Sequence, residues 1–502
     1  MFSPADAAGF KKPNTMQDAP IVLATVNARY THTAFGLRWL HANMGTLRDK
    51  TVVREFALGQ PPLEIVESVL AHRPRVIGLG VYIWNVAVLT QVAQAIKAVR
   101  PDLALVVGGP EISYEYETAP LFGTADYLIR GEAEHAFAAL AARVLNGERP
   151  SEKVITPELP DLDALHLPYD GYAPDDIAQR IIYVETSRGC PFRCEFCLSS
   201  IDPCVREFSL EPVLRAMARL IERGARRFTF VDRTFNLREA RVEAVLSFFL
   251  DHWQDGIQLH FEILPDRLTD AMIQSFGRFP AGALYLETGV QTLDPQVQEA
   301  ISRRQDVQAT LRTIARLRGD TGAIIHIDLV AGLPGETWQS FKAGFDAVIE
   351  LRPHVIQLGI LKRLKGAPIR RHETAGRLVF ALHPPYEILQ TDTMPFQEMQ
   401  RIKRLARYLD LYYNSGNFPR TLPILHRARA SAFDAYMALS DALWAGTGRT
   451  HEFPLSELAR WLYRFLKDSE VEEPSVIAST IEDDYHRLPG RRDRLRLHDR
   501  AD

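Results

Sequence analysis

Cysteine is scarce in this chain: its 502 residues include four, and Cys190, Cys194 and Cys197 fall within eight positions. A disulfide framework needs cysteines spread along the chain, so the sequence excludes a small disulfide-stapled fold. Clustered thiols are typical of a metal site in a reducing compartment, and we therefore expect a cytoplasmic protein. Cys204 stands apart from the cluster.

The sequence also lacks long apolar runs and an excess of positive charge. No apolar run reaches the length of a membrane span, and residues 1–20 lack the compact apolar core of a signal peptide. The formal net charge is −4, so no overall positive field draws the chain to nucleic acid or an anionic membrane. We expect no nucleic-acid partner and no membrane span. The expected substrate is a small molecule, or a peptide or lipid presented by a partner.

The composition along the chain divides it into six regions. Residues 19–146 and 179–369 each alternate β-branched runs with helical patterns, which predicts two α/β domains with parallel sheets. The first is of the flavodoxin or Rossmann type, and the second has six predicted βα units, enough for a partial or full (β/α) barrel. The other regions are a tail (1–18), a linker (147–178), a helical domain without recurring strand signals (370–490) and a charged, solvated tail (491–502).

The three clustered cysteines follow the first predicted barrel strand, Ile181–Glu185, with the spacing Cys-x3-Cys-x2-Cys. Three thiolates on one short loop can converge on three irons of a cubane cluster and leave the fourth iron open to a ligand. The alternative is a structural zinc loop, for which Cys204 would have to serve as the fourth ligand.

The segment from Thr186 to Cys197, with the sequence TSRGCPFRCEFC, resembles the radical S-adenosylmethionine (SAM) superfamily. The resemblance implies a [4Fe-4S] cluster on Cys190, Cys194 and Cys197 whose open iron chelates SAM. It implies reductive cleavage of SAM to a 5′-deoxyadenosyl radical, with electrons from a flavodoxin or ferredoxin-type donor. Later strand ends resemble the superfamily's SAM-binding motifs, and the residues implied are Phe196, Asp232, Glu262, Glu287, Arg303, Val330 and Gly332. No residue that acts on the substrate is identified.

Glycine-rich strand ends in residues 19–146 resemble the cobalamin-binding domain that precedes many radical SAM barrels. Small residues there let backbone approach a flat macrocycle or its nucleotide tail. The cobalamin contacts implied are Gly80, Val81, Tyr82, Trp84, Asn85, Gly108, Gly109, Pro110, Glu111, Gly131 and Glu132. The motif Asp-x-His-x-x-Gly is missing and His32 does not fit it, so we expect no protein histidine on the lower face of cobalamin. A flavodoxin-like domain used only for packing is the alternative.

The combined resemblance implies a cobalamin-dependent enzyme, and we expect methylation of an unactivated carbon or phosphorus centre. The same architecture resembles the anaerobic magnesium-protoporphyrin monomethyl ester cyclase, so an oxidative cyclase is an alternative. A cobalamin or redox sensor is a third. A methylthiotransferase would need about three more cysteines for a second cluster, and the chain does not have them. The carboxyl-terminal region resembles an uncharacterised extension of such proteins, and we expect it to cap the open end of the barrel.

Overall fold

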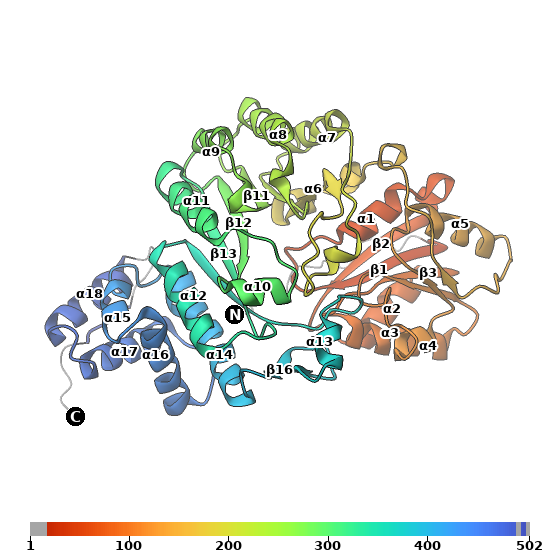
Figure 1. Ribbon diagram of the computed structural model, residues 1–502. Helices are drawn as coiled ribbons and strands as arrows, with labels where there is room; N and C mark the ends of the chain where they lie inside the picture. Colours follow the sequence, from red (N-terminus) through yellow and green to blue (C-terminus); the bar gives the residue numbers. More distant parts are fainter. Residues whose placement is uncertain (1–17, 488–492, 498–502) are drawn as a thin grey trace.

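The computed structural model describes residues 18–487 and 493–497, and two parallel sheets organise it (Figure 1). Predicted tail residues 1–17, 491, 492 and 498–502 lie outside the described residues. Within the described part, no helix is both long enough and apolar enough to cross a membrane.

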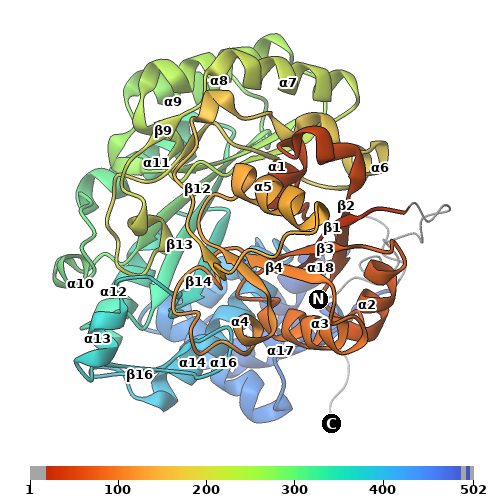
Figure 2. The ribbon, with the colours of Figure 1, turned by 90° about the vertical axis from the view of Figure 1, so that its right-hand side faces the viewer.

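The amino-terminal sheet has the strand order β2-β1-β3-β4-β5-β6, and all its pairs are parallel. Its strands are β1 (Ile21–Asn27), β2 (Thr51–Ala57), β3 (Val76–Gly80), β4 (Ala104–Gly108), β5 (Tyr127–Ile129) and β6 (Val154–Ile155). Helices α1 (Phe35–Ala42) and α5 (Glu134–Leu145) cover one face, and α2 (Pro62–Leu70), α3 (Val86–Val99) and α4 (Pro120–Thr124) cover the other (Figure 2). Both faces are buried, which explains why the strands are apolar runs. The predicted fold class is confirmed here.

The second sheet has the order β14-β13-β12-β11-β10-β7, again with every pair parallel. The strands are β7 (Ile182–Val184), β10 (Arg227–Phe230), β11 (Gln258–Ile263), β12 (Leu284–Gln291), β13 (Ile324–Ala331) and β14 (Val355–Ile360). The helices between them are α7 (Leu210–Glu222), α8 (Glu239–Asp251), α9 (Asp270–Gly277), α10 (Pro295–Ala300), α11 (Val307–Asp320) and α12 (Trp338–Glu350). Because β7 and β14 end the order, the barrel is partial, with six strands. A short ribbon of β8 (Ser187–Arg188) and β9 (Arg206–Glu207) flanks the cysteine loop.

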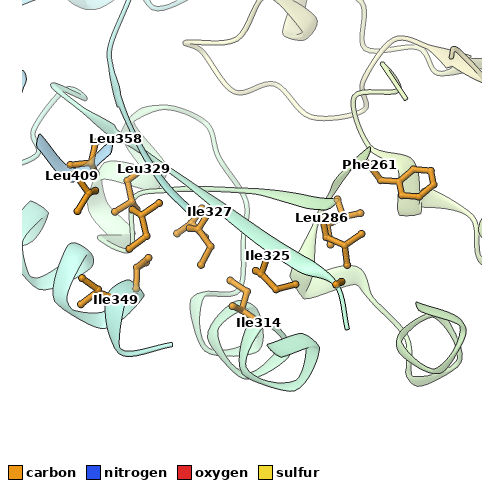
Figure 3. Close-up of a cluster of buried hydrophobic side chains, with 14 of the residues drawn as sticks. Phe261, Leu286, Ile314, Ile325, Ile327, Leu329, Ile349, Leu358 and Leu409 are labelled. Atoms are coloured by element: carbon orange, nitrogen blue, oxygen red, sulfur yellow. The ribbon is translucent and has the colours of Figure 1, made fainter. Parts of the chain in front are cut away.

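Side chains along β13 alternate between apolar ones that face the surrounding helices and polar ones that face the inside of the barrel. Ile325, Ile327 and Leu329 are buried and face the surrounding helices, where Ile314 of α11 and Ile349 of α12 join the same cluster (Figure 3). Because successive strand residues point to opposite faces, His326 and Asp328 point inward. The apolar layer therefore fixes which polar side chains the barrel presents to its interior.

The linker between the two sheets is ordered, because it contains β6 and α6 (Pro174–Gln179) and buries Leu162, Tyr169 and Tyr172. The region after residue 370 is mainly helical, as expected, and it also contains one short hairpin. Strands β15 (Leu378–Phe380) and β16 (Ile388–Thr391) pair in an antiparallel hairpin. The helices are α13 (Arg370–Thr374), α14 (Phe396–Leu409), α15 (Leu422–Arg427), α16 (Ala432–Thr447), α17 (Leu455–Asp468) and α18 (Pro474–His486).

The carboxyl-terminal helices cover the open edge of the barrel sheet at β14. Asn414, just after α14, accepts a hydrogen bond from Ile356 N of β14 and donates one to Ile356 O, both at 2.9 Å. Helix α16 packs on α12, as Figure 1 also shows. This edge cover removes unpaired strand groups from solvent, and the expected cap over the barrel mouth stays a prediction. In the described part of the predicted solvated tail, Leu495 is buried at 2% exposure, while Asp493, Arg494 and Arg496 are exposed.

Candidate functional site

The loop after β7 brings the three clustered cysteines to the wall of one cavity at the carboxyl end of the barrel strands. Backbone hydrogen bonds hold the loop, from Cys190 N to Asp202 O and from Cys197 N to Cys194 O, each 3.0 Å. Burial raises the pKa of the Cys190 and Cys194 thiols, so their thiolates need a positive partner such as a metal. Three thiols and no fourth protein sulfur on this cavity fit a [4Fe-4S] cluster with one open iron.

The position of Cys204, the fourth ligand that a structural zinc site would need, does not support the zinc alternative. Cys204 is exposed and is not among the residues that line the cavity. A closed tetrahedral site needs four converging ligands, and the described loop supplies three.

Four of the predicted SAM contacts line the same cavity: Phe196, Glu262, Glu287 and Arg303. Arg303 donates from Nη1 to Cys194 Sγ at 3.5 Å and from Nη2 to the carbonyl oxygen of Gly289. Burial raises the pKa of Glu262 to about 7, although Arg233, 3.6 Å away, acts in the opposite direction. The four predicted contacts therefore contribute a guanidinium, two carboxyl groups and an aromatic ring beside the thiols.

The other three predicted SAM contacts, Asp232, Val330 and Gly332, are not among the lining residues. The buried Asp232 carboxylate accepts hydrogen bonds from Thr186 N (3.0 Å), Thr186 Oγ1 (2.6 Å) and Ser187 Oγ (2.6 Å), so it braces the start of the cysteine loop. Gly332 has a φ of +90°, and a Cβ there would lie 2.6 Å from Ile388 of the hairpin. Val330 packs against the core.

Sequence reasoning missed Arg233, Thr234 and Asp328, which line the cavity. Thr234 Oγ1 is 3.9 Å from Cys190 Sγ. A signal for Asp328 was present, because it stands two residues before Val330 and a strand puts such residues on one face.

A second cavity lies at the glycine-rich strand ends of the amino-terminal sheet. The predicted cobalamin contacts that line it are Gly80, Tyr82, Gly108, Gly109, Gly131 and Glu132, and Phe35, Trp39 and Phe137 form apolar walls. Gly109 has a φ of +111°, and a Cβ there would be 2.5 Å from Val81 O, so only glycine fits. Glycine backbone beside apolar walls lets a large flat cofactor such as cobalamin come close to the chain.

Five predicted cobalamin contacts, Val81, Trp84, Asn85, Pro110 and Glu111, do not line this cavity. Asn85 is fully buried and its amide donates to Val26 O at 3.0 Å, which fixes the β3 turn. Trp84 is 43% exposed and stacks on Tyr82 with ring centroids 4.5 Å apart. Glu111 accepts a hydrogen bond from Tyr386 Oη at 2.8 Å and pairs with Lys365 at 3.1 Å. It therefore contacts the segments that follow β14.

No histidine is among the residues that line the second cavity. His32 lies elsewhere, with Nδ1 2.5 Å from Tyr183 Oη, and burial lowers its pKa. The expectation that His32 is not a cobalt ligand stays a prediction, and the geometry agrees with it.

Arg188 connects the second cavity to the loop that carries the cysteines. It lines the second cavity and precedes Cys190 by two residues. Its guanidinium pairs with Glu132 (2.5 Å) and Glu134 (2.8 Å) of the amino-terminal domain and with Glu185 (3.1 Å) at the end of β7. Burial raises the pKa of Glu185 to about 7. One buried cation thus ties the second cavity to the cysteine loop, a contact that sequence analysis had no signal to find.

Comparisons with protein families match three models along the chain. Residues 21–141 match the B12 binding domain, residues 184–347 the Radical SAM superfamily, and residues 377–499 a protein family of unknown function, DUF4080. The first two imply cobalamin, a [4Fe-4S] cluster and SAM as cofactors.

Relatives and solved structures agree with these domains. The cobalamin-dependent radical SAM methyltransferase TokK of Streptomyces tokunonensis is 23% identical over 73% of this chain, a match that spans 58% of TokK. A tRNA-2-methylthio-N(6)-dimethylallyladenosine synthase of Cereibacter sphaeroides is 26% identical over 50% of this chain and 58% of its own length. The chain thus spans under two thirds of both relatives.

Two solved structures share the fold across most of the chain. The structure of the radical SAM methyltransferase TsrM from Kitasatospora setae, with cobalamin and a [4Fe-4S] cluster bound, has a TM-score of 0.59 and 16% identity. It covers 90% of this chain and 99% of TsrM. The cobalamin-dependent radical enzyme OxsB, with aqua-cobalamin and SAM bound, has a TM-score of 0.63 and 12% identity, over 94% of this chain and 83% of OxsB. The chain therefore combines a B12 binding domain with a radical SAM domain, and it is a relative of the cobalamin-dependent radical SAM methyltransferases.

Proposed function

We propose that this enzyme transfers a methyl group from SAM to an unactivated carbon or phosphorus centre of a small molecule. The observation that carries the proposal is the bridge through Arg188, because it sets the glycine-lined cavity directly beside the cysteine loop. Such a reaction needs a radical source and a methyl carrier in one enclosed space, and rigid placement of the two is what the protein contributes.

In this proposal Cys190, Cys194 and Cys197 hold the [4Fe-4S] cluster. The Arg303 guanidinium, already 3.5 Å from Cys194 Sγ, is placed to bind the carboxylate of SAM. Glu262 and Glu287 would accept hydrogen bonds from its amino or hydroxyl groups, and Phe196 would contact its adenine.

The amino-terminal cavity would hold part of cobalamin against its glycines, while Phe35, Trp39 and Phe137 exclude water. When bound, the cluster and cobalamin supply reductive cleavage of SAM and carriage of a methyl group. Asp232, through Thr186 and Ser187, keeps the cysteine loop in place while these groups bind.

The test is product analysis on anaerobically reconstituted protein with cobalamin, SAM and a reductant. We expect 5′-deoxyadenosine together with S-adenosylhomocysteine, the latter rising when a small-molecule extract supplies substrate. The variant with Cys190, Cys194 and Cys197 all changed to Ala is the matched control and should form no 5′-deoxyadenosine. Formation of 5′-deoxyadenosine without S-adenosylhomocysteine would contradict methyl transfer and favour the oxidative alternative, and formation of neither would favour a sensor.

A further inference from the structure

Three neighbouring barrel strands direct ionisable side chains into the barrel interior. His260 and Glu262 come from β11, Glu287 from β12, and His326 and Asp328 from β13. The strand register places Glu262 beside Glu287 and Glu287 beside His326. Only Glu287, Glu262 and Asp328 of this group also line the cavity of the cysteine loop.

Glu287, His326 and Asp328 converge tightly. One ligand atom of each lies within 4.8 Å of the other two. His326 Nε2 and Asp328 Oδ1 are 3.3 Å apart, yet both atoms are buried without a hydrogen-bond partner. A buried polar atom left without a partner costs free energy, and two carboxylates side by side repel. A protonated His326 would offset part of this repulsion, and a bound metal ion would satisfy both atoms and both carboxylates at once.

The spacing selects the kind of cation. Two ligand atoms that each lie ~2.1 Å from one metal ion, at tetrahedral or octahedral angles, are about 3.0–3.4 Å apart. Two acceptors of an ammonium group, each ~2.8 Å from its nitrogen, would be about 4.6 Å apart. The observed 3.3 Å between His326 Nε2 and Asp328 Oδ1 fits two ligands of one metal ion better than two acceptors of an ammonium group, and it also fits a direct ion pair with protonated His326.

We propose that Glu287, His326 and Asp328 form a binding site for a divalent transition-metal ion, with Zn²⁺ or Fe²⁺ as the ions that mixed imidazole and carboxylate ligands suit. His260 supports the site, because its Nε2 lies 2.8 Å from Glu287 Oε2 and orients that carboxylate. With a metal ion on Glu287, Glu262 would be the carboxylate left to contact SAM. Glu287 and Asp328 also line the cavity of the cysteine loop, so a substrate oxygen or nitrogen in that cavity could complete the coordination. The inference does not rest on methyl transfer.

The experiment uses the full-length chain with Cys190, Cys194 and Cys197 changed to Ala, so that no thiol of the cluster competes. Co²⁺ is the probe, titrated by visible absorption and by calorimetry with Zn²⁺ in competition. We expect one ion per chain. His326→Ala and Asp328→Asn should each weaken binding by about 100-fold or more, and His260→Ala by about 10- to 100-fold.

The matched control is His354→Ala, because His354 Nδ1 accepts a hydrogen bond from Ile325 N of the same strand, 3.0 Å away, and belongs to no part of the trio. It should bind Co²⁺ as tightly as its parent. Absence of binding, or binding that survives both Asp328→Asn and His326→Ala, would overturn the proposal and leave the trio as an ion pair. If the triple Ala variant does not fold, metal analysis of the reconstituted wild type replaces the titration. One zinc or a fifth iron beside the four cluster irons, lost in Asp328→Asn, supports the site, and protein with four irons and no zinc contradicts it.

Discussion

At the scale of single residues, the cysteine loop depends on a few polar contacts that the barrel supplies. Asp232 holds Thr186 and Ser187, Arg303 contacts Cys194, and Thr234 lies beside Cys190. These contacts orient the thiols before any metal binds. The loop is thus preorganised, which lowers the cost of assembling a cluster on it.

The first prediction concerns the four cysteines. Changing Cys190, Cys194 and Cys197 together to Ala should abolish the iron-sulfur absorbance of reconstituted protein, because the cluster then has no thiolate ligand. Cys204→Ala is the control and should keep four irons per chain, since Cys204 is exposed and away from the cavity. Loss of the cluster in Cys204→Ala would show that the ligand assignment is wrong.

Sequence alone predicts residues whose role is local, such as the spaced cysteines and the glycines at strand ends. Sequence does not predict which of two neighbouring partners a side chain at a strand end will contact. Asp232 stands at the expected strand end, yet its carboxylate turns to Thr186 and not to the cavity. Arg188 and Glu134 are 54 positions apart, so no local pattern could reveal their ion pair.

At the scale of elements, the barrel strands were predictable because β-branched runs mark them, and the first, predicted at Ile181–Glu185, lies at Ile182–Val184. The hairpin of β15 and β16 was not, because strands of three and four residues carry too little periodicity. It forms because Ile388 N donates to Leu361 O and the Ile388 side chain packs on Gly332.

The loop between β13 and α12 carries a prediction about pH. Glu336 is buried, its Oε1 accepts from Thr292 Oγ1 at 2.8 Å, and its Oε2 has no partner in the described structure. Burial raises its pKa to about 8. A carboxyl whose folded pKa is raised stabilises the fold below its unfolded pKa of ~4.5, and this stability is lost as pH rises through about 8.

Glu336→Gln should remove that dependence. Between pH 5 and pH 8 we expect the wild type to lose about 1–3 kcal/mol more unfolding free energy than Glu336→Gln, measured by denaturant unfolding at each pH. Parallel pH profiles of the two proteins would mean that Glu336 is ionised in the fold at neutral pH.

At the scale of the whole molecule, buried ion pairs connect the amino-terminal domain to the rest. Arg188 bridges to Glu132 and Glu134 on one side, and Lys365 pairs with Glu111 on another. All three glutamates follow strand ends that resemble cobalamin-binding segments. The charges that join the domains are therefore part of the same region that would receive cobalamin.

Removing the cation at the centre of this junction should be costly. Arg188→Ala leaves Glu134 and Glu185 buried without their cation and Glu132 with Arg206 alone, and we expect a loss of about 3–5 kcal/mol in unfolding free energy. Arg100→Ala removes an exposed pair with Asp102 and should leave the melting temperature nearly unchanged. Equal melting temperatures for Arg188→Ala and wild type would show that the junction does not stabilise the fold.

The central claim is that cobalamin and radical SAM chemistry act together in this chain to move a methyl group. The most direct measurement follows the isotope from SAM labelled in its methyl group, with reduced holoenzyme, cobalamin and a small-molecule extract as the source of substrate. Methyl transfer predicts that label enters a new extractable product, in amounts that match the S-adenosylhomocysteine released. Methyl transfer would be contradicted if the holoenzyme forms 5′-deoxyadenosine and consumes an extract component while its product stays unlabelled.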